Sequence, residues 1–100
     1  MKIARRIRPN KRTSETITYY REGSRYQMTV GFFPDGAVGE VFLNADRHAS
    51  LLDVLMSDAA IIASLALQYG CPLEAITHAV KRNGSGIASS PIGAALDLIR

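Results

Sequence analysis

The chain has 100 residues, of which 47% are hydrophobic and 21% are charged. This length predicts one domain, and the composition is that of an ordinary globular protein and excludes a disordered chain. The single cysteine, Cys71, excludes an internal disulfide and fits a cytoplasmic location, where thiols stay reduced.

The chain shows no pattern of a secretion signal or of a membrane-spanning helix. Basic residues open the chain, but no apolar stretch follows them as in a signal peptide. The longest uncharged run near the middle lies between Asp58 and Glu74. Gly70 and Pro72 interrupt it before it reaches the ~20 apolar residues that span a bilayer. We therefore expect no membrane partner.

The net charge of +3 hides an uneven distribution. Residues 1–12 carry six of the 12 Lys and Arg residues and none of the 9 acidic residues, which gives +6. The rest of the chain carries six basic and nine acidic residues, which gives −3. We predict a basic arm over residues 1–14 that precedes a single domain over residues 15–100. Such an arm binds nucleic acid or an acidic protein surface, or it is a solvated tail.

Three segments after the arm have the composition of β-strands. Residues 16–20 are rich in β-branched and aromatic side chains, and apolar residues alternate with polar ones over residues 26–32. A Pro-Asp-Gly turn at residues 34–36 leads to a third segment over residues 39–43. Such short connections predict a three-stranded antiparallel meander with one face open to helices.

A long helix is predicted from residues 48–50 to about Tyr69, where Gly70 acts as the C-cap. Nearly all of its residues are apolar, and a helix of this kind must be covered on most sides. Its polar residues fall within one narrow stripe when successive residues are placed about 100° apart. These residues are Ser50, Asp53, Ser57, Ser64 and Gln68.

We expect a second copy of the chain, in a homodimer, or a larger protein to cover the rest of this helix. The predicted interface residues are Leu55, Asp58 and Ile62. Asp58 lies outside the polar stripe, so we expect it to be paired, to cap another element, or to lie at the interface.

Two shorter helices are predicted to complete an α+β fold. Pro72 suits the first turn of one helix, whose last turn is basic at residues 81–82. Ser89 or Ser90 caps the other helix, which Pro91 opens. The predicted architecture is therefore a three-stranded antiparallel β-meander followed by a long, mostly apolar helix and two shorter helices.

The segment between the two shorter helices has the composition of an anion- or nucleotide-binding loop. Basic side chains, glycines, hydroxyls and the free amides of a helix start occur together there, although their spacing fits no Walker or dinucleotide motif. A flexible linker has the same composition, so both interpretations stay open. Arg47 and His48, at the start of the long helix, form a second candidate anion site. The candidate loop residues are Lys81, Arg82, Gly84, Ser85, Gly86, Ser89 and Ser90.

We predict no catalytic residue, no metal site and no cofactor. A zinc site usually needs four ligands, whereas Cys71 is the single cysteine. Cys71 is either a small residue that fills a helix junction or, in a third hypothesis, the centre of a thiol-dependent activity.

Two segments resemble a known domain family. Residues 29–42 read TVGFFPDGAVGEVF and are similar to the strand–turn–strand of TSCPD domains, where an acidic-Gly turn precedes Gly-Glu-(Val/Ile)-Phe. Residues 64–74 read SLALQYGCPLE and resemble the Ser-x-x-Leu-Gln-Tyr-Gly-x-Pro-Leu-Glu stretch of the same domains. The basic residues 8–12 are similar to the family's lead-in. The resemblance covers most of residues 8–82 and, more loosely, the last helix.

TSCPD domains stand at the C-terminus of adenosylcobalamin-dependent class II ribonucleoside-diphosphate reductases. The resemblance implies a stand-alone accessory module of deoxyribonucleotide synthesis that associates with itself or docks onto a reductase catalytic subunit. The Thr-Ser-Cys-Pro-Asp signature is absent, so the resemblance implies no metal or signature role for Cys71. The alternative is a small nucleic-acid- or nucleotide-binding protein that uses residues 1–12 and the loop at residues 84–90.

Overall fold

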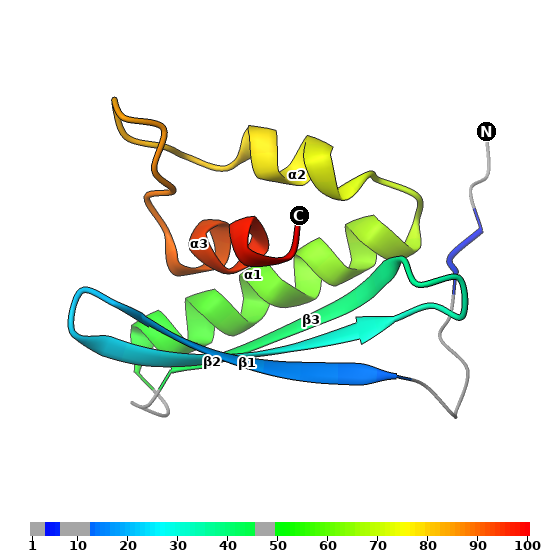
Figure 1. Cartoon of the computed structure of the whole chain (residues 1–100), viewed down its shortest axis with the longest axis horizontal. Coiled ribbons are helices and arrows are strands. Elements are labelled where there is room, and N and C mark those ends of the chain that lie inside the picture. The colour runs from blue at the N-terminus through cyan, green and yellow to red at the C-terminus, as the bar shows by residue number, and fades with distance from the viewer. Residues whose placement is uncertain (1–3, 7–12, 46–49) are drawn as a thin grey trace.

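The computed structural model describes residues 4–6, 13–45 and 50–100. Within these ranges, three strands, β1 (Ser14–Arg21), β2 (Ser24–Phe32) and β3 (Val38–Ala45), form one antiparallel sheet in the order β1-β2-β3. The described residues after the sheet form three helices, α1 (Leu51–Gln68), α2 (Leu73–Ala79) and α3 (Pro91–Ile99). Figure 1 shows all three helices on the same side of the sheet, with α2 farthest from it. The α+β prediction is confirmed.

Both connections in the meander use the residue types that their backbone requires. Glu22 and Gly23 join β1 to β2 with φ angles of 51° and 76°. Two positive φ angles in a row are typical of a hairpin turn that matches the twist of its strands. Between β2 and β3, Gly36 has a φ of 87°, and the Asp35 carboxylate accepts a hydrogen bond from the Ala37 amide at 3.0 Å. These turns fix the register of the sheet.

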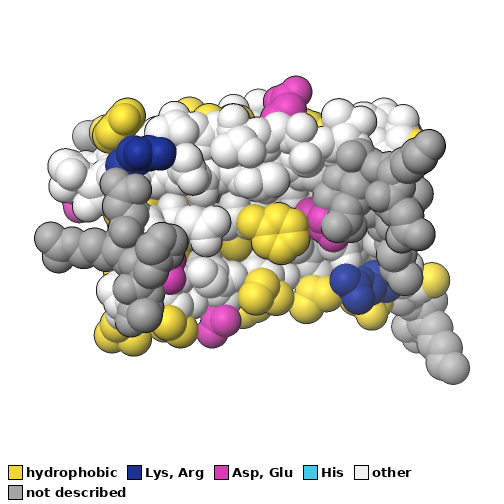
Figure 2. All heavy atoms as spheres, turned by 90° about the horizontal axis from the view of Figure 1, so that it is seen from below, with side chains coloured by type: hydrophobic (Ala, Val, Ile, Leu, Met, Phe, Trp, Pro, Cys, Tyr) yellow, Lys and Arg dark blue, Asp and Glu magenta, His cyan; other side chains and the backbone are white. Residues whose placement is uncertain are grey.

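One face of the sheet forms the core together with α1 and α3. Met28, Val30 and Val41 are inaccessible to solvent on this face, as are Ala95 and Leu96 of α3. Figure 2 shows the opposite face, where hydrophobic side chains are scattered and gather along one edge. An antiparallel sheet with one buried and one solvated face follows from the alternation of side chains along its strands.

Helix α1 begins and ends close to where its capping residues predict. The Ser50 hydroxyl accepts a hydrogen bond from the Asp53 amide at 3.1 Å, as an N-cap does. At the other end, Gly70 has a φ of 96°, and the Cys71 amide donates to the Ala66 carbonyl at 2.9 Å. This is the Schellman pattern, in which glycine supplies the left-handed backbone that stops the helix.

Helix α2 is shorter than the sequence indicates. It ends at Ala79, so Lys81 and Arg82 lie beyond it and not in its last turn. Arg82 instead pairs with Ala88 in an isolated antiparallel bridge, which closes the segment between α2 and α3 into a loop. Ser90, one of the two predicted residues, caps α3.

Helix α1 also has the length and composition of a helix that could cross a membrane. Its 18 residues have a mean hydropathy of 1.6, and 33% of them are buried within the domain. The interruptions at Gly70 and Pro72 lie after the helix, so they do not shorten it. Core helices of soluble proteins have the same properties, and one side of α1 packs along β3.

Candidate interaction surface

Polar side chains of α1 close the free edge of β3. Ser64 is buried, and its hydroxyl accepts a hydrogen bond from the Val41 amide at 2.8 Å and lies 3.0 Å from the Val41 carbonyl oxygen. One turn later, the Gln68 side-chain amide donates to the Gly39 carbonyl at 2.9 Å. An edge strand leaves one row of backbone groups unpaired, and these bonds satisfy part of that row.

The dimensions of helix and strand allow such contacts along their whole length. Asp53, near the start of α1, accepts a long hydrogen bond from the Ala45 amide at 3.5 Å. From Asp53 to Gln68 the helix rises about 22 Å, and from Ala45 to Gly39 the strand spans about 20 Å. The helix therefore runs antiparallel to β3 over a matching length, and its polar stripe faces the strand.

The opposite side of α1 is apolar and exposed. Leu51 is 74% exposed, Ile62 is 66% exposed and Leu55 is 58% exposed. Asp58 is exposed on the same side. The three predicted interface residues therefore lie on one open face, which we call the α1 face, and their role in binding stays a prediction. The other exposed apolar residues of this helix and its C-cap are Leu52, Val54, Ile61, Leu65 and Tyr69.

Two arginines assigned to the basic arm contact the junction between α1 and β3. Arg5 Nε donates to Gln68 Oε1 at 2.6 Å, and the Arg6 amide donates to the Gln68 carbonyl at 2.7 Å. The Arg6 guanidinium forms an ion pair with Asp35 at 2.9 Å and lies 3.8 Å from the centroid of the Phe33 ring. Residues 4–6 therefore pack against the domain.

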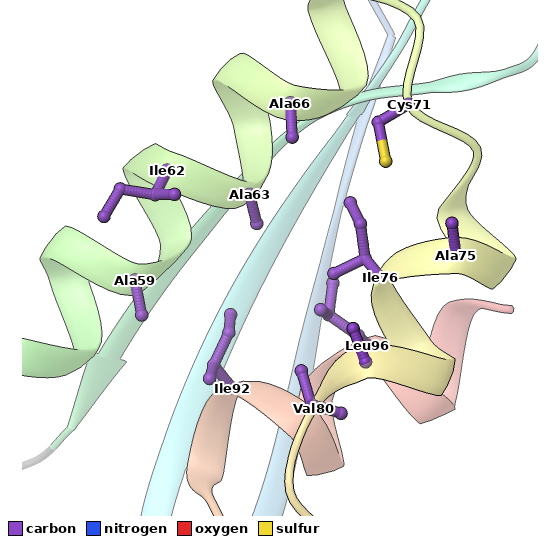
Figure 3. Close-up of a pocket in the computed structure, with 11 residues that line it drawn as sticks. Ala59, Ile62, Ala63, Ala66, Cys71, Ala75, Ile76, Val80, Ile92 and Leu96 are labelled. Atoms are coloured by element: carbon purple, nitrogen blue, oxygen red, sulfur yellow. The ribbon is translucent and has the colours of Figure 1, made fainter.

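An apolar groove of about 390 Å³ lies between α1 and the two shorter helices. Figure 3 shows side chains of α1, α2 and α3 around this space, with the sulfur of Cys71 at one end. A smaller hollow of about 250 Å³ shares Ala59 and Ile92 with it and extends the apolar surface toward the start of α1. The groove is lined by Ala59, Ile62, Ala63, Ala66, Cys71, Ala75, Ile76, Ala79, Val80, Ile92 and Leu96.

The residues of the predicted anion-binding loop lie together between α2 and α3. Arg82 forms hydrogen bonds with other residues of the chain. Its guanidinium donates to both carboxylate oxygens of Asp97 at 2.7 Å, and to the carbonyls of Thr77 and Gly86. Hydrogen bonding to Arg82 holds the pKa of Asp97 below its ordinary value, and the same bond raises the pKa of Arg82. Arg82 therefore links the loop to α3.

The side chain of Asn83, which is not among the candidate anion-binding residues, orders the backbone of this loop. Asn83 Oδ1 accepts hydrogen bonds from the amides of Ser85 and Ile87 at 2.9 Å and 3.0 Å. The Ser89 amide donates to the Lys81 carbonyl at 2.9 Å. Several amides that an anion could use are therefore engaged within the loop, and anion binding there stays a prediction.

Arg47 and His48, the second candidate anion site, lie outside the described residues, as do residues 1–3 and 7–12. Nucleic-acid binding by residues 1–12 therefore stays a prediction. In the part of the chain that the structure describes, no group of three His, Cys, Asp or Glu side chains could hold a metal ion. Cys71 is half-buried, and its sulfur lies 3.7 Å from the Pro72 carbonyl oxygen.

Comparison with known proteins agrees with the resemblance seen in the sequence. The family model of the TSCPD domain matches residues 1–98. A vitamin B12-dependent ribonucleotide reductase of Agrobacterium fabrum is 35% identical over 71 residues, which are 71% of this chain and 6% of the relative. A reductase of the same description from Streptantibioticus cattleyicolor is 38% identical over 66 residues, which are 66% of this chain and 11% of the relative. No solved structure matches the chain.

The matched segment thus spans only 6% and 11% of the length of these two relatives, and the match concerns a domain within them. The two segments that carry the resemblance, residues 29–42 and 64–74, contact each other through the bonds of Ser64 and Gln68 to β3. The segments that carry the resemblance therefore join the long helix to the sheet in this chain. This chain belongs to the TSCPD domain family.

Proposed function

We propose that this chain is an accessory module of deoxyribonucleotide synthesis that acts by association and not by catalysis. It binds a second copy of itself or a subunit of a B12-dependent ribonucleotide reductase. The relatives named above are reductases that carry a similar segment within a much longer chain, and this supports the choice of partner.

The observation that carries the proposal is the exposed α1 face. Monomeric soluble proteins rarely expose large contiguous apolar patches, and such patches mark binding surfaces. Here eight apolar residues on one helix and its C-cap are each at least 38% exposed. Two polar residues of α1, Ser64 and Gln68, form hydrogen bonds with β3 and therefore do not solubilise the exposed side of the helix.

The test is capture of a purified B12-dependent reductase chain, taken from a genome that encodes a close relative of this domain, on the immobilised full chain. We expect the double variant Leu55→Lys/Ile62→Lys to bind at least tenfold more weakly. Binding would bury two ammonium groups in an apolar interface, and the removal of these charges from water costs free energy. Circular dichroism checks that the variant is folded.

The matched control is Ile87→Lys, since Ile87 is 62% exposed in the loop between α2 and α3. This variant should bind like the unmodified chain. A folded chain that neither binds the reductase nor forms oligomers contradicts the proposal. Equal loss of binding in the control and the double variant would show that charge alone, and not the α1 face, governs the interaction.

A further inference from the structure

We infer that the α1 face binds a second copy of this chain, with the two α1 helices packed antiparallel about a two-fold axis at the level of Ala60. This inference rests on the proposed function in so far as both use the α1 face. The identity of the partner, a second copy of this chain, and the antiparallel geometry can each be disproved independently of binding to a reductase.

The exposed residues of α1 have the spacing of a helix-pairing seam. The centre of the α1 face follows steps of four and three residues, within an arc of about 80° on the helix. A pattern of this kind is the seam along which two helices pack side by side. The seam residues are Leu51, Leu55, Asp58, Ile62, Leu65 and Tyr69, all of them exposed.

This seam is also self-complementary. In an antiparallel pair centred on the level of Ala60, Leu51 lies opposite the partner's Tyr69. Leu55 then lies opposite the partner's Leu65, and Asp58 opposite the partner's Ile62. Every seam residue therefore meets another one, and the overlap covers the whole helix from Leu51 to its C-cap. A two-fold dimer requires such an isologous surface.

The charge of Asp58 favours the antiparallel orientation. In a parallel dimer each seam residue meets its own copy, so two carboxylates would face each other in an apolar interface, and this repulsion disfavours that arrangement. In the antiparallel register Asp58 faces Ile62 of the partner subunit, and the two Asp58 residues are offset by about 6 Å along the helix axis. A single polar residue in a seam commonly selects orientation and register at some cost in affinity.

The size of the exposed surface also suits a dimer. Eight exposed apolar residues on α1 and its C-cap together present several hundred Å², which is comparable to the ~800 Å² that each partner contributes to a standard interface. Seven of them belong to α1 itself, and Tyr69 is its C-cap. Pairing of two α1 helices would therefore cover a surface of the size that a specific dimer needs.

The experiment is sedimentation equilibrium of the full chain and its variants. The unmodified chain should form a dimer at micromolar concentration, and Leu55→Lys/Ile62→Lys should be monomeric. Asp58→Leu should lower the dimer dissociation constant at least tenfold, because it removes a carboxylate that must be desolvated. Ile87→Lys should dimerise like the unmodified chain. Far-ultraviolet circular dichroism confirms that each variant is folded.

Cross-linking tests the geometry, with Cys71→Ser present to remove the native thiol. The variant that also carries Leu55→Cys and Leu65→Cys should oxidise to a covalent dimer, because these positions face each other across the axis. Leu55→Cys alone should not, since its two copies lie about 15 Å apart along the helices. Efficient cross-linking of Leu55→Cys alone would indicate a parallel pair and overturn the inference.

Two further outcomes separate this inference from the proposed function. A chain that is monomeric up to high micromolar concentration but captures the reductase overturns the inference and leaves the proposed function standing. A dimer with the expected response of Asp58→Leu that captures no reductase supports the inference and contradicts docking. An Asp58→Leu variant whose dissociation constant is unchanged contradicts the antiparallel seam.

Discussion

At the scale of single residues, Gly39 shows why a family segment has glycine at one position. A side chain there would place its Cβ 2.9 Å from Cζ of Phe33, whose ring is buried. The sequence identifies Gly39 through the family resemblance alone. The physical requirement comes from a ring that the turn at residues 34–36 folds back onto β3.

We therefore expect Gly39→Ala to lower the free energy of unfolding by about 1–3 kcal/mol, the usual cost of overpacking a filled site. Urea denaturation followed by circular dichroism measures it. Gly84→Ala is the matched control, because a Cβ at Gly84 meets nothing within 4 Å and its φ is not positive. Equal stability of the two variants would show that the Phe33 ring moves aside at no cost.

The ion pair of Arg82 with Asp97 predicts a dependence of stability on pH. The folded-state pKa of Asp97 lies below its unfolded value because of the hydrogen bonds from Arg82. The stabilisation is therefore complete above the unfolded pKa of about 3.9, and it is lost as the pH falls through the folded-state pKa.

Asp97→Asn should consequently be less stable than the unmodified chain at pH 6, and the difference should shrink progressively below pH about 4. Thermal unfolding from pH 6 to pH 2 measures this difference. If the difference in stability between Asp97→Asn and the unmodified chain stays the same down to pH 2, packing of the side chain, and not its charge, stabilises the loop.

At the scale of elements, the polar stripe of α1 replaces a fourth strand. The edge of β3 is a row of backbone donors and acceptors that could otherwise pair with another chain. Side chains of α1 satisfy this edge at Val41 and Gly39. One helix therefore protects the sheet edge and, on its other side, presents an apolar surface.

Ser64→Ala should lower the free energy of unfolding by about 1–3 kcal/mol, because it leaves the buried Val41 amide without a partner. Ser57→Ala, two turns earlier on the same polar stripe, is the matched control. Ser57 is half-buried, and its truncation should change stability by about 0.5 kcal/mol or less. Chemical denaturation compares the two, and a larger loss in Ser57→Ala would contradict the assigned role of Ser64.

At the scale of the whole molecule, the first described residues belong to the folded unit. Arg5 binds the side chain of Gln68, and Arg6 binds its carbonyl and the ring of Phe33. The family match over residues 1–98 includes this segment. The charge distribution predicts a basic arm, but it does not indicate that two of the arginines in it hold the end of α1.

Removal of residues 1–6 should therefore lower the free energy of unfolding by about 1–2 kcal/mol, which is the usual net contribution of one or two hydrogen bonds to stability. Differential scanning calorimetry measures the loss. Replacement of residues 1–3 by glycine and serine keeps Arg5 and Arg6 and should leave the stability unchanged. A truncated chain with full stability would show that residues 4–6 are not part of the folded unit.

The sequence alone determined the α+β class, the order of the elements, the ends of α1 and the family. These features depend on local rules, such as alternation in strands, a serine N-cap at residue 89 or 90, and Gly70 as the residue that stops α1. It also predicted Leu55, Asp58 and Ile62 as interface residues, because a helix so apolar must be covered.

Only the tertiary structure decided which side of α1 faces the sheet. The helical pattern by itself allows Ser64 and Gln68 to face either water or protein. They turn inward because β3 is an edge strand, and its unpaired Val41 and Gly39 groups require hydrogen-bond partners. That requirement arises from the strand order and from the direction in which α1 returns along β3, and no local pattern contains either of them.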